Sequence, residues 1–253
     1  MSFELKNLPF REAKPRQAGI TMSMDKGLSV REAEDLMDVA GPCIDVVKLG
    51  FGTSVVTRNL EKKLEVYRSA GMPYYFGGTL MEAYIIRNQF DDYCRLIEHH
   101  GCSYVEVSDG SIEMSMEQKC GYISQLAKNF TVLSEVGSKD ANVVIPPYKW
   151  VELMKTELEA GAWKVIAEAR ESGTVGVFEK TGAANTGLVD EIIHYVPSDK
   201  ILWEAPLKSQ QVWFIQLLGT NVNLGNIAPT EVIALETLRI GLRGDTFFTF
   251  LNK

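Results

Sequence analysis

The chain has 253 residues, of which 45% are hydrophobic and 23% charged, a composition typical of a soluble globular protein with a substantial core. Its formal net charge of −7 argues against nucleic-acid binding, because such surfaces require clustered Lys and Arg side chains. The four cysteines form no C-x-x-C pair, so neither a zinc site nor a disulfide framework is predicted. No apolar run is long enough for a signal peptide or a membrane span, so we expect a cytoplasmic protein without membrane contact.

Short apolar runs alternate with helical patterns along most of the chain. Residues 1–17 are polar, contain Pro9 and Pro15, and are predicted to be an irregular lead-in. The expected strands are 19–25, 44–49, 73–76, 104–107, 131–136, 164–169, 201–204 and 221–224. The expected helices are 30–40, 60–70, 82–100, 116–128, 148–160, 189–195, 209–218 and 229–240.

The order of these elements predicts the fold class. Gly41, Gly71 and Gly101 follow three successive helices at equal spacing, about the length of one strand-helix unit. The strands are apolar on both faces, as parallel strands covered by helices must be. Eight such units in about 250 residues predict an α/β fold, a (β/α)8 TIM barrel that forms a single domain over residues 1–253. A doubly wound open sheet is the alternative.

Polar side chains fall at the carboxyl ends of the expected strands, where barrels of this kind carry their active sites. They are Asp25, Lys48, Glu82, Glu106, Ser108, Asp109, Glu135, Lys139, Glu168, Arg170, Glu204, Asn223 and Asn226. A solvated helix face does not produce this regularity. We therefore expect one functional site at this rim of the barrel.

Glu106, Glu135 and Glu168 each lie inside an apolar run on neighbouring strands, where a buried carboxylate requires a compensating cation. In one interpretation, three basic side chains form an ion-pair network with them. These are Lys48, Lys139 and Arg170. In the other interpretation the carboxylates bind a divalent metal, and oxygen ligands favour Mg²⁺. Because the chain has only three histidines, all in expected helices, a zinc or iron site is not predicted.

Lys139 is our candidate for proton transfer. Beside a metal and Arg170, in a partly dry site, the pKa of a lysine can fall toward neutrality and allow it to act as an acid or base. A permanent counter-ion for Glu135 and Glu106 is an equally simple role for it.

Two segments at the same rim are candidates for phosphate binding. Gly225 and Asn226 precede a helix that begins with a proline, so free backbone N-H groups would face the pocket. Loops after strands seven and eight often bind phosphate in this fold. Gly77, Gly78 and Thr79 offer a similar set of N-H groups. In both segments, forming a turn is the alternative role of the glycines.

Taken together, these motifs resemble the phosphosulfolactate synthase family over nearly the whole chain. They are Arg16-x-x-Gly19-x-Thr21-x-x-x-Asp25-x-Gly27, Asp45-x-x-Lys48-x-Gly50-x-Gly52-Thr53, Gly77-Gly78-Thr79-Leu80-x-Glu82, Glu106-x-Ser108-Asp109-Gly110, Glu135-Val-Gly137-x-Lys139, Glu168-Ala-Arg170-Glu171-Ser172-Gly173, Trp203-Glu204-Ala205-Pro206 and Asn223-Leu-Gly225-Asn226. The chain also resembles plant heat-stress-associated proteins of the same family.

The resemblance implies a (β/α)8 barrel, Mg²⁺ dependence, and addition of sulfite to phosphoenolpyruvate to give (2R)-phospho-3-sulfolactate, a step toward coenzyme M or sulfolactate. On this basis we expect three glutamates to bind the metal, Lys139 to protonate C2, and two basic residues to orient the anions. The glutamates are Glu106, Glu135 and Glu168, and the basic residues are Arg170 and Lys48. Arg16, just ahead of the first strand, is assigned to substrate binding.

Two alternatives remain open at this stage. One is a different Mg²⁺-assisted reaction on a phosphorylated or carboxylated small molecule, and the other is a stress-associated binding protein without turnover. Barrels of this type often form homo-oligomers through their outer helices. Trp150, Trp163 and Trp213 fit such an interface or core packing equally well.

Overall fold

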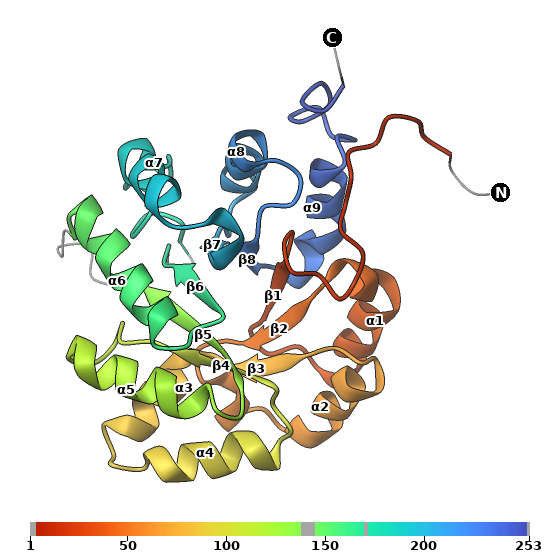
Figure 1. Ribbon diagram of the computed structural model, residues 1–253. Coiled ribbons are helices and arrows are strands. Elements are labelled where there is room, and N and C mark those ends of the chain that lie inside the picture. The colour runs from red at the N-terminus through yellow and green to blue at the C-terminus, as the bar shows by residue number, and fades with distance from the viewer. Residues whose placement is uncertain (1–3, 138–144, 170–171, 252–253) are drawn as a thin grey trace.

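The computed structural model describes residues 4–137, 145–169 and 172–251, and its centre is one ring of parallel strands (Figure 1). The strands are β1 Thr21–Asp25, β2 Val46–Leu49, β3 Tyr74–Phe76, β4 Tyr104–Val107, β5 Thr131–Val136, β6 Lys164–Ala167, β7 Ile201–Glu204 and β8 Leu224–Ile227. Their order is β3-β2-β1-β8-β7-β6-β5-β4, and contacts between β3 and β4 complete the ring. The predicted (β/α)8 barrel is therefore confirmed.

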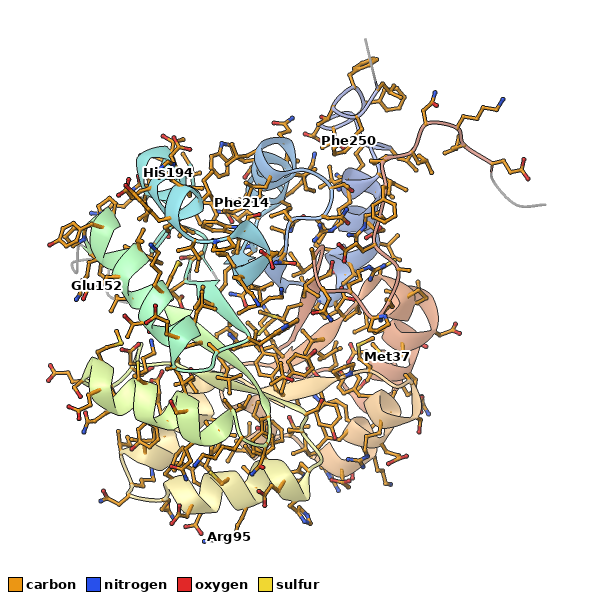
Figure 2. The ribbon with its side chains drawn as sticks, viewed as in Figure 1. Met37, Arg95, Glu152, His194, Phe214 and Phe250 are labelled. Atoms are coloured by element: carbon orange, nitrogen blue, oxygen red, sulfur yellow. The ribbon has the colours of Figure 1, made fainter. Side chains whose placement is uncertain are left out.

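Helices surround the ring on its outside (Figure 1). They are α1 Val30–Ala40, α2 Leu60–Ser69, α3 Gly78–Ile85, α4 Phe90–His99, α5 Met116–Leu126, α6 Pro147–Glu159, α7 Thr186–Tyr195, α8 Lys208–Leu218 and α9 Val232–Arg239. Figure 2 shows Arg95 and Glu152 on the outer surface, whereas Phe214 of α8 faces inward and stacks on Trp203 of β7, with ring centroids 4.8 Å apart. Across the described ranges, no helix has the length and apolar character needed to cross a bilayer.

The interior of the ring is filled by alternate residues of the strands, because successive side chains of a strand point to opposite faces. The inward residues nearer the amino ends form an apolar cluster. It comprises Ile20, Met22, Val46, Tyr75, Leu133, Ile166 and Leu202. In four of the strands, a buried charged residue follows two positions after an apolar member of this cluster, within the strand or directly after it. These are Lys48, Glu135, Glu168 and Glu204. The alternation thus puts charge at the carboxyl ends of the barrel.

Several expected elements differ from the structure by a few residues at their ends, and two differences bear on the site. The helix predicted over 82–100 is two helices, α3 and α4, because Asn88 takes a left-handed conformation (φ 56°) between them. The last strand begins at Leu224 and not at residue 221. Asn223 therefore lies at the amino end of β8, where its side chain donates to the carbonyl oxygens of Asp199 and Ile201.

The three tryptophans named above make contacts within the chain. Trp150 is buried in the core, Trp163 packs edge-on against Tyr104, and Trp213 packs against Phe214. These contacts explain the tryptophans without a partner subunit, and the homo-oligomer stays a prediction.

Candidate active site

A pocket of about 450 Å³ opens at the carboxyl ends of the strands. It is lined by Met24, Lys48, Phe51, Gly77, Thr79, Glu106, Ser111, Glu135, Glu168, Ser172, Glu204 and Asn226. The lining comes from strands and loops around the ring, so the carboxyl ends of the strands converge on one cavity, as expected for this fold.

Three carboxylates in this pocket are close enough to bind one metal ion. One oxygen from each of Glu135, Glu168 and Glu204 lies within 4.8 Å of the other two. All three side chains are buried and come from neighbouring strands or the residue directly after one. Carboxylate oxygens are ligands that Mg²⁺ prefers, so the donor set fits this ion.

Glu106, which the sequence placed in the metal group, lies in an ion pair instead. Its Oε2 is 2.8 Å from Lys48 Nζ and accepts a hydrogen bond from the Tyr75 hydroxyl at 3.1 Å. Its Oε1 accepts the backbone N-H of Gly78 at 2.7 Å. Both oxygens are therefore engaged, and Glu204 completes the acidic group in its place.

Lys48 is the positive charge at the centre of the described part of the pocket. Besides Glu106, its Nζ lies 3.6 Å from Glu204 Oε1 and 3.9 Å from Glu135 Oε2. Burial acts to lower the pKa of Lys48, but Glu106 and the other nearby acidic groups outweigh it and raise the pKa well above its ordinary value. The Lys48 ammonium is therefore held in its charged form by the acidic groups around it.

Glu204 is a buried carboxylate that lies beside Glu135 and Glu168 in the pocket. Burial is the main reason that its pKa rises to about 7, with Glu135 adding to the effect and Lys48 opposing it. Additional positive charge is therefore favourable here, whether a divalent ion or basic side chains supply it. The sequence held a signal for this residue, since Glu204 ends an apolar strand directly before Ala205 and Pro206.

The residues predicted to bind phosphate differ in whether they line the pocket. Gly77 and Thr79 line the pocket at the start of α3, although the N-H of Gly78 is already bonded to Glu106. Gly225 lies within β8 and not in a loop, and a Cβ there would be 2.8 Å from Met22 Cε.

Asn226 lies in the same strand, β8, and faces the pocket. Its buried Oδ1 has no hydrogen-bond partner among the described residues. The amide is therefore available to a ligand.

Arg16 does not line this pocket, and its role in substrate binding stays a prediction. Its guanidinium donates to Asp45 Oδ1 at 3.1 Å and to the backbone oxygen of Glu12 at 2.9 Å. Asp45 precedes β2, so this contact lies at the amino end of the barrel, opposite the acidic group. Lys139 and Arg170 lie outside the described residues, and their roles stay predictions.

Two rim residues of the sequence analysis have structural roles. Asp25 is fully buried, 2.7 Å from Lys63 Nζ, and accepts the Tyr67 hydroxyl at 2.9 Å. Glu82 accepts backbone N-H groups of Gly110 and Ser111, and so fixes the loop after β4. Neither carboxylate belongs to the acidic group of the pocket.

The ring of parallel strands and the buried acidic pocket define a (β/α)8 barrel whose polar groups gather where barrels of this class carry their active sites. Comparison with known proteins names the family. The chain belongs to the (2R)-phospho-3-sulfolactate synthase (ComA) family, whose sequence model matches residues 9–245.

Known members of this family align with the chain over nearly their whole length. The chain is 42% identical to the phosphosulfolactate synthase of Bacillus subtilis (strain 168) over 244 residues, covering 95% of this chain and 97% of the relative. It is 44% identical to the phosphosulfolactate synthase of Methanocaldococcus jannaschii over 237 residues, covering 91% and 94%. The chain is therefore an enzyme of this family. The resemblance to plant heat-stress-associated proteins stays a prediction.

Solved structures with similar folds are more distant in sequence. A 3-hexulose-6-phosphate synthase from Salmonella typhimurium has a TM-score of 0.59 and 15% identity, covering 88% of this chain and 100% of that chain. The YdjI aldolase from Escherichia coli K12 has a TM-score of 0.55 and 13% identity, covering 91% and 94%. At these identities the likeness shows the fold alone.

Proposed function

We propose that this enzyme adds sulfite to phosphoenolpyruvate in a Mg²⁺-dependent reaction that gives (2R)-phospho-3-sulfolactate. The observation that carries the proposal is the buried group of Glu135, Glu168 and Glu204 beside Lys48, in a chain of the synthase family. Phosphoenolpyruvate and sulfite are small anions, and a pocket lined with carboxylates alone would repel them. A cation bound to those carboxylates removes the repulsion.

The acidic group is the proposed metal site. Glu135, Glu168 and Glu204 would hold Mg²⁺ directly or through water, because the site offers hard oxygen donors. When bound, Mg²⁺ would stabilise the negative charge that develops on the substrate carboxylate during the addition. The Oδ1 of Asn226, which has no hydrogen-bond partner within the described part of the chain, is a further oxygen at the same pocket, available to a water or a substrate group.

The protein side chains supply orientation and the proton. The sulfur of sulfite forms a bond to C3, and the π-electron pair of the C2–C3 bond moves toward C2 and the carboxylate. Lys48, whose position is fixed by Glu106, attracts the anionic substrates and orients them in the pocket. In the proposed second step, Lys139 gives a proton to C2 from one face and is reprotonated from solvent. Arg170 is proposed to help orient the anions.

Incubation of the purified protein with phosphoenolpyruvate, sulfite and Mg²⁺, followed by mass detection of the adduct, tests this function. The expected product has the mass of phosphoenolpyruvate plus sulfurous acid and does not form when EDTA is present. Other enol and 2-oxo acids serve as controls. Adduct formation from one of these acids and not from phosphoenolpyruvate would identify a different Mg²⁺-assisted reaction. Ligand binding measured by calorimetry without any product would identify a binding protein.

A further inference from the structure

A buried ion pair lies behind β5, on the side of the strand that faces the helices. Lys119 of α5 and Glu157 of α6 are 2% and 1% exposed, and Lys119 Nζ lies 2.8 Å from Glu157 Oε1. The same Nζ donates to the backbone oxygen of Glu135 at 2.6 Å. Lys119 thus contacts the main chain of a proposed metal ligand without facing the pocket itself.

Glu157 makes a second contact with the same strand. Its Oε2 accepts a hydrogen bond from Ser134 Oγ at 2.6 Å. Since successive side chains point to opposite faces, Ser134 faces the helices and Glu135 faces the pocket. The two halves of the ion pair therefore hold two consecutive residues of β5, and with them the direction in which the Glu135 carboxylate projects.

Lys119 also connects β5 to the neighbouring strand. Its Nζ lies 2.9 Å from Oδ1 of Asp109, which follows β4 three residues after Glu106. Burial acts to lower the pKa of Lys119, but Glu157 and Asp109 outweigh it and raise the pKa, so the ammonium stays charged. One fixed charge thus joins the carboxyl ends of β4 and β5, which carry Glu106 and Glu135.

Stability alone does not account for this arrangement. A buried ion pair contributes little net stability compared with well-packed apolar side chains of similar volume. Partners behind the ligands of a metal site, in contrast, commonly change metal affinity by about 10- to 100-fold when they are removed. We propose that Lys119 and Glu157 are positioning residues that hold Glu135 in place for Mg²⁺ binding. The proposal rests on the metal site of the proposed function.

Lys119→Met is the direct test, because Met keeps much of the length of the side chain and removes its charge. Lys164→Met is the matched control. Lys164 is also 2% exposed and donates to the backbone oxygens of Gln17 and Asp199, but it lies at the amino end of β6, away from the acidic group. Mg²⁺ affinity is measured by calorimetric titration, and the melting temperature is measured on the same samples.

We expect both variants to lose stability, and only Lys119→Met to lose Mg²⁺ affinity, by about tenfold or more. The double variant Lys119→Met, Glu157→Met removes the unpaired buried carboxylate. It should melt at a higher temperature than Lys119→Met while its Mg²⁺ affinity stays reduced. Because an apolar pair replaces the ion pair, this variant also tests the proposal if the single variant does not fold.

Wild-type affinity in folded Lys119→Met, or in the double variant, would overturn the positioning role. So would an equal loss of affinity in Lys164→Met, because general destabilisation would then be the cause. Wild-type protein that binds no Mg²⁺ gives a different result. It would overturn the metal site itself and the positioning role with it.

Discussion

Lys48 Nζ lies 2.8 Å from Glu106 Oε2 at the mouth of the barrel, and this ion pair divides the acidic residues of the pocket into two groups. Glu106 is engaged by Lys48, by the Tyr75 hydroxyl and by the N-H of Gly78. Glu135, Glu168 and Glu204 form the other group. Glu106 lies nearest to Lys48, whereas the second group, two of whose members also lie within 4 Å of Lys48 Nζ, has the geometry to bind a cation from solution.

This division predicts different effects for two isosteric substitutions. Glu204→Gln removes a proposed metal ligand, so we expect the Mg²⁺ affinity to fall by about tenfold or more, equivalent to about 1.4 kcal/mol. Glu106→Gln leaves the three carboxylates in place and should reduce Mg²⁺ affinity far less. Instead it should raise KM for phosphoenolpyruvate, because Lys48 is no longer fixed. Mg²⁺ titrations and initial rates of both variants test this, and equal losses of affinity would argue against the two groups.

Lys139 is the proposed proton donor. Lys139→Ala should abolish turnover, because no group would then protonate C2, while Mg²⁺ affinity and melting temperature change little. Lys128→Ala, an exposed lysine just after α5, is the control and should retain full activity. Activity that survived in Lys139→Ala would remove this residue from the proposed role.

Asn226 has a left-handed backbone (φ 56°) and an amide oxygen that no group in residues 4–137, 145–169 and 172–251 hydrogen-bonds. Asn226→Gly keeps that conformation accessible and removes the amide. We expect KM for phosphoenolpyruvate to rise several-fold, since one hydrogen bond contributes about 1 kcal/mol, with little change in melting temperature. Asn226→Ala should lose stability as well, because alanine is less favourable than asparagine in the left-handed region. An unchanged KM in the Gly variant would show that the amide does not contact the substrate.

Gly137 follows β5 at a point where no side chain fits. Its φ is 141°, and a Cβ would lie 2.5 Å from Glu168 Cβ and 2.8 Å from Trp150 Cη2. Gly137→Ala should therefore displace Glu168, lower Mg²⁺ affinity and reduce stability by roughly 1–3 kcal/mol. Gly121→Ala, in α5 with open space around the position, should leave activity unchanged and raise stability by about 0.5–1 kcal/mol. Chemical denaturation of the pair provides the comparison.

Lys164 makes the stability depend on pH above neutrality. Burial lowers its pKa from 10.5 to about 8, so between pH 8 and 10.5 the unfolded chain binds more protons at this residue than the native protein. Its contribution therefore makes unfolding less favourable as pH rises through that window. The difference in urea midpoint between wild type and Lys164→Met should change in favour of wild type from pH 8 to pH 10. A difference independent of pH would contradict the lowered pKa.

The fold was predictable because each strand is short, apolar on both faces and followed by a helix. A capping box begins α1, with Ser29 and Glu32 bonded to each other's backbone N-H groups, and its Ser-x-x-Glu spacing is visible in the sequence. The start of β8 was not predictable from local sequence. Residues 221–223 alternate polar, apolar and polar, which is the pattern of a strand. In the structure, however, the side chain of Asn223 donates hydrogen bonds to the backbone around the start of β7.

The location of the candidate site was predictable from the sequence, but the ion pairs between its residues were not. Alternation along β5 and β7 indicates that Glu135 and Glu204 face the interior. It cannot show that Lys48 from β2 reaches past β3 to Glu106 on β4, because that choice depends on the relative heights of residues in the closed ring. Lys119 carried no signal either, since it lies in a helix pattern far from any strand end.

Diffraction from crystals soaked with Mn²⁺, recorded at the manganese absorption edge, tests the central claim most directly, because Mn²⁺ takes the same oxygen ligands as Mg²⁺. We predict an anomalous peak in the pocket, coordinated by Glu135, Glu168 and Glu204, with Glu106 still bonded to Lys48. A pocket without a peak, or an ion bound by Glu106 in place of Glu204, would contradict the account.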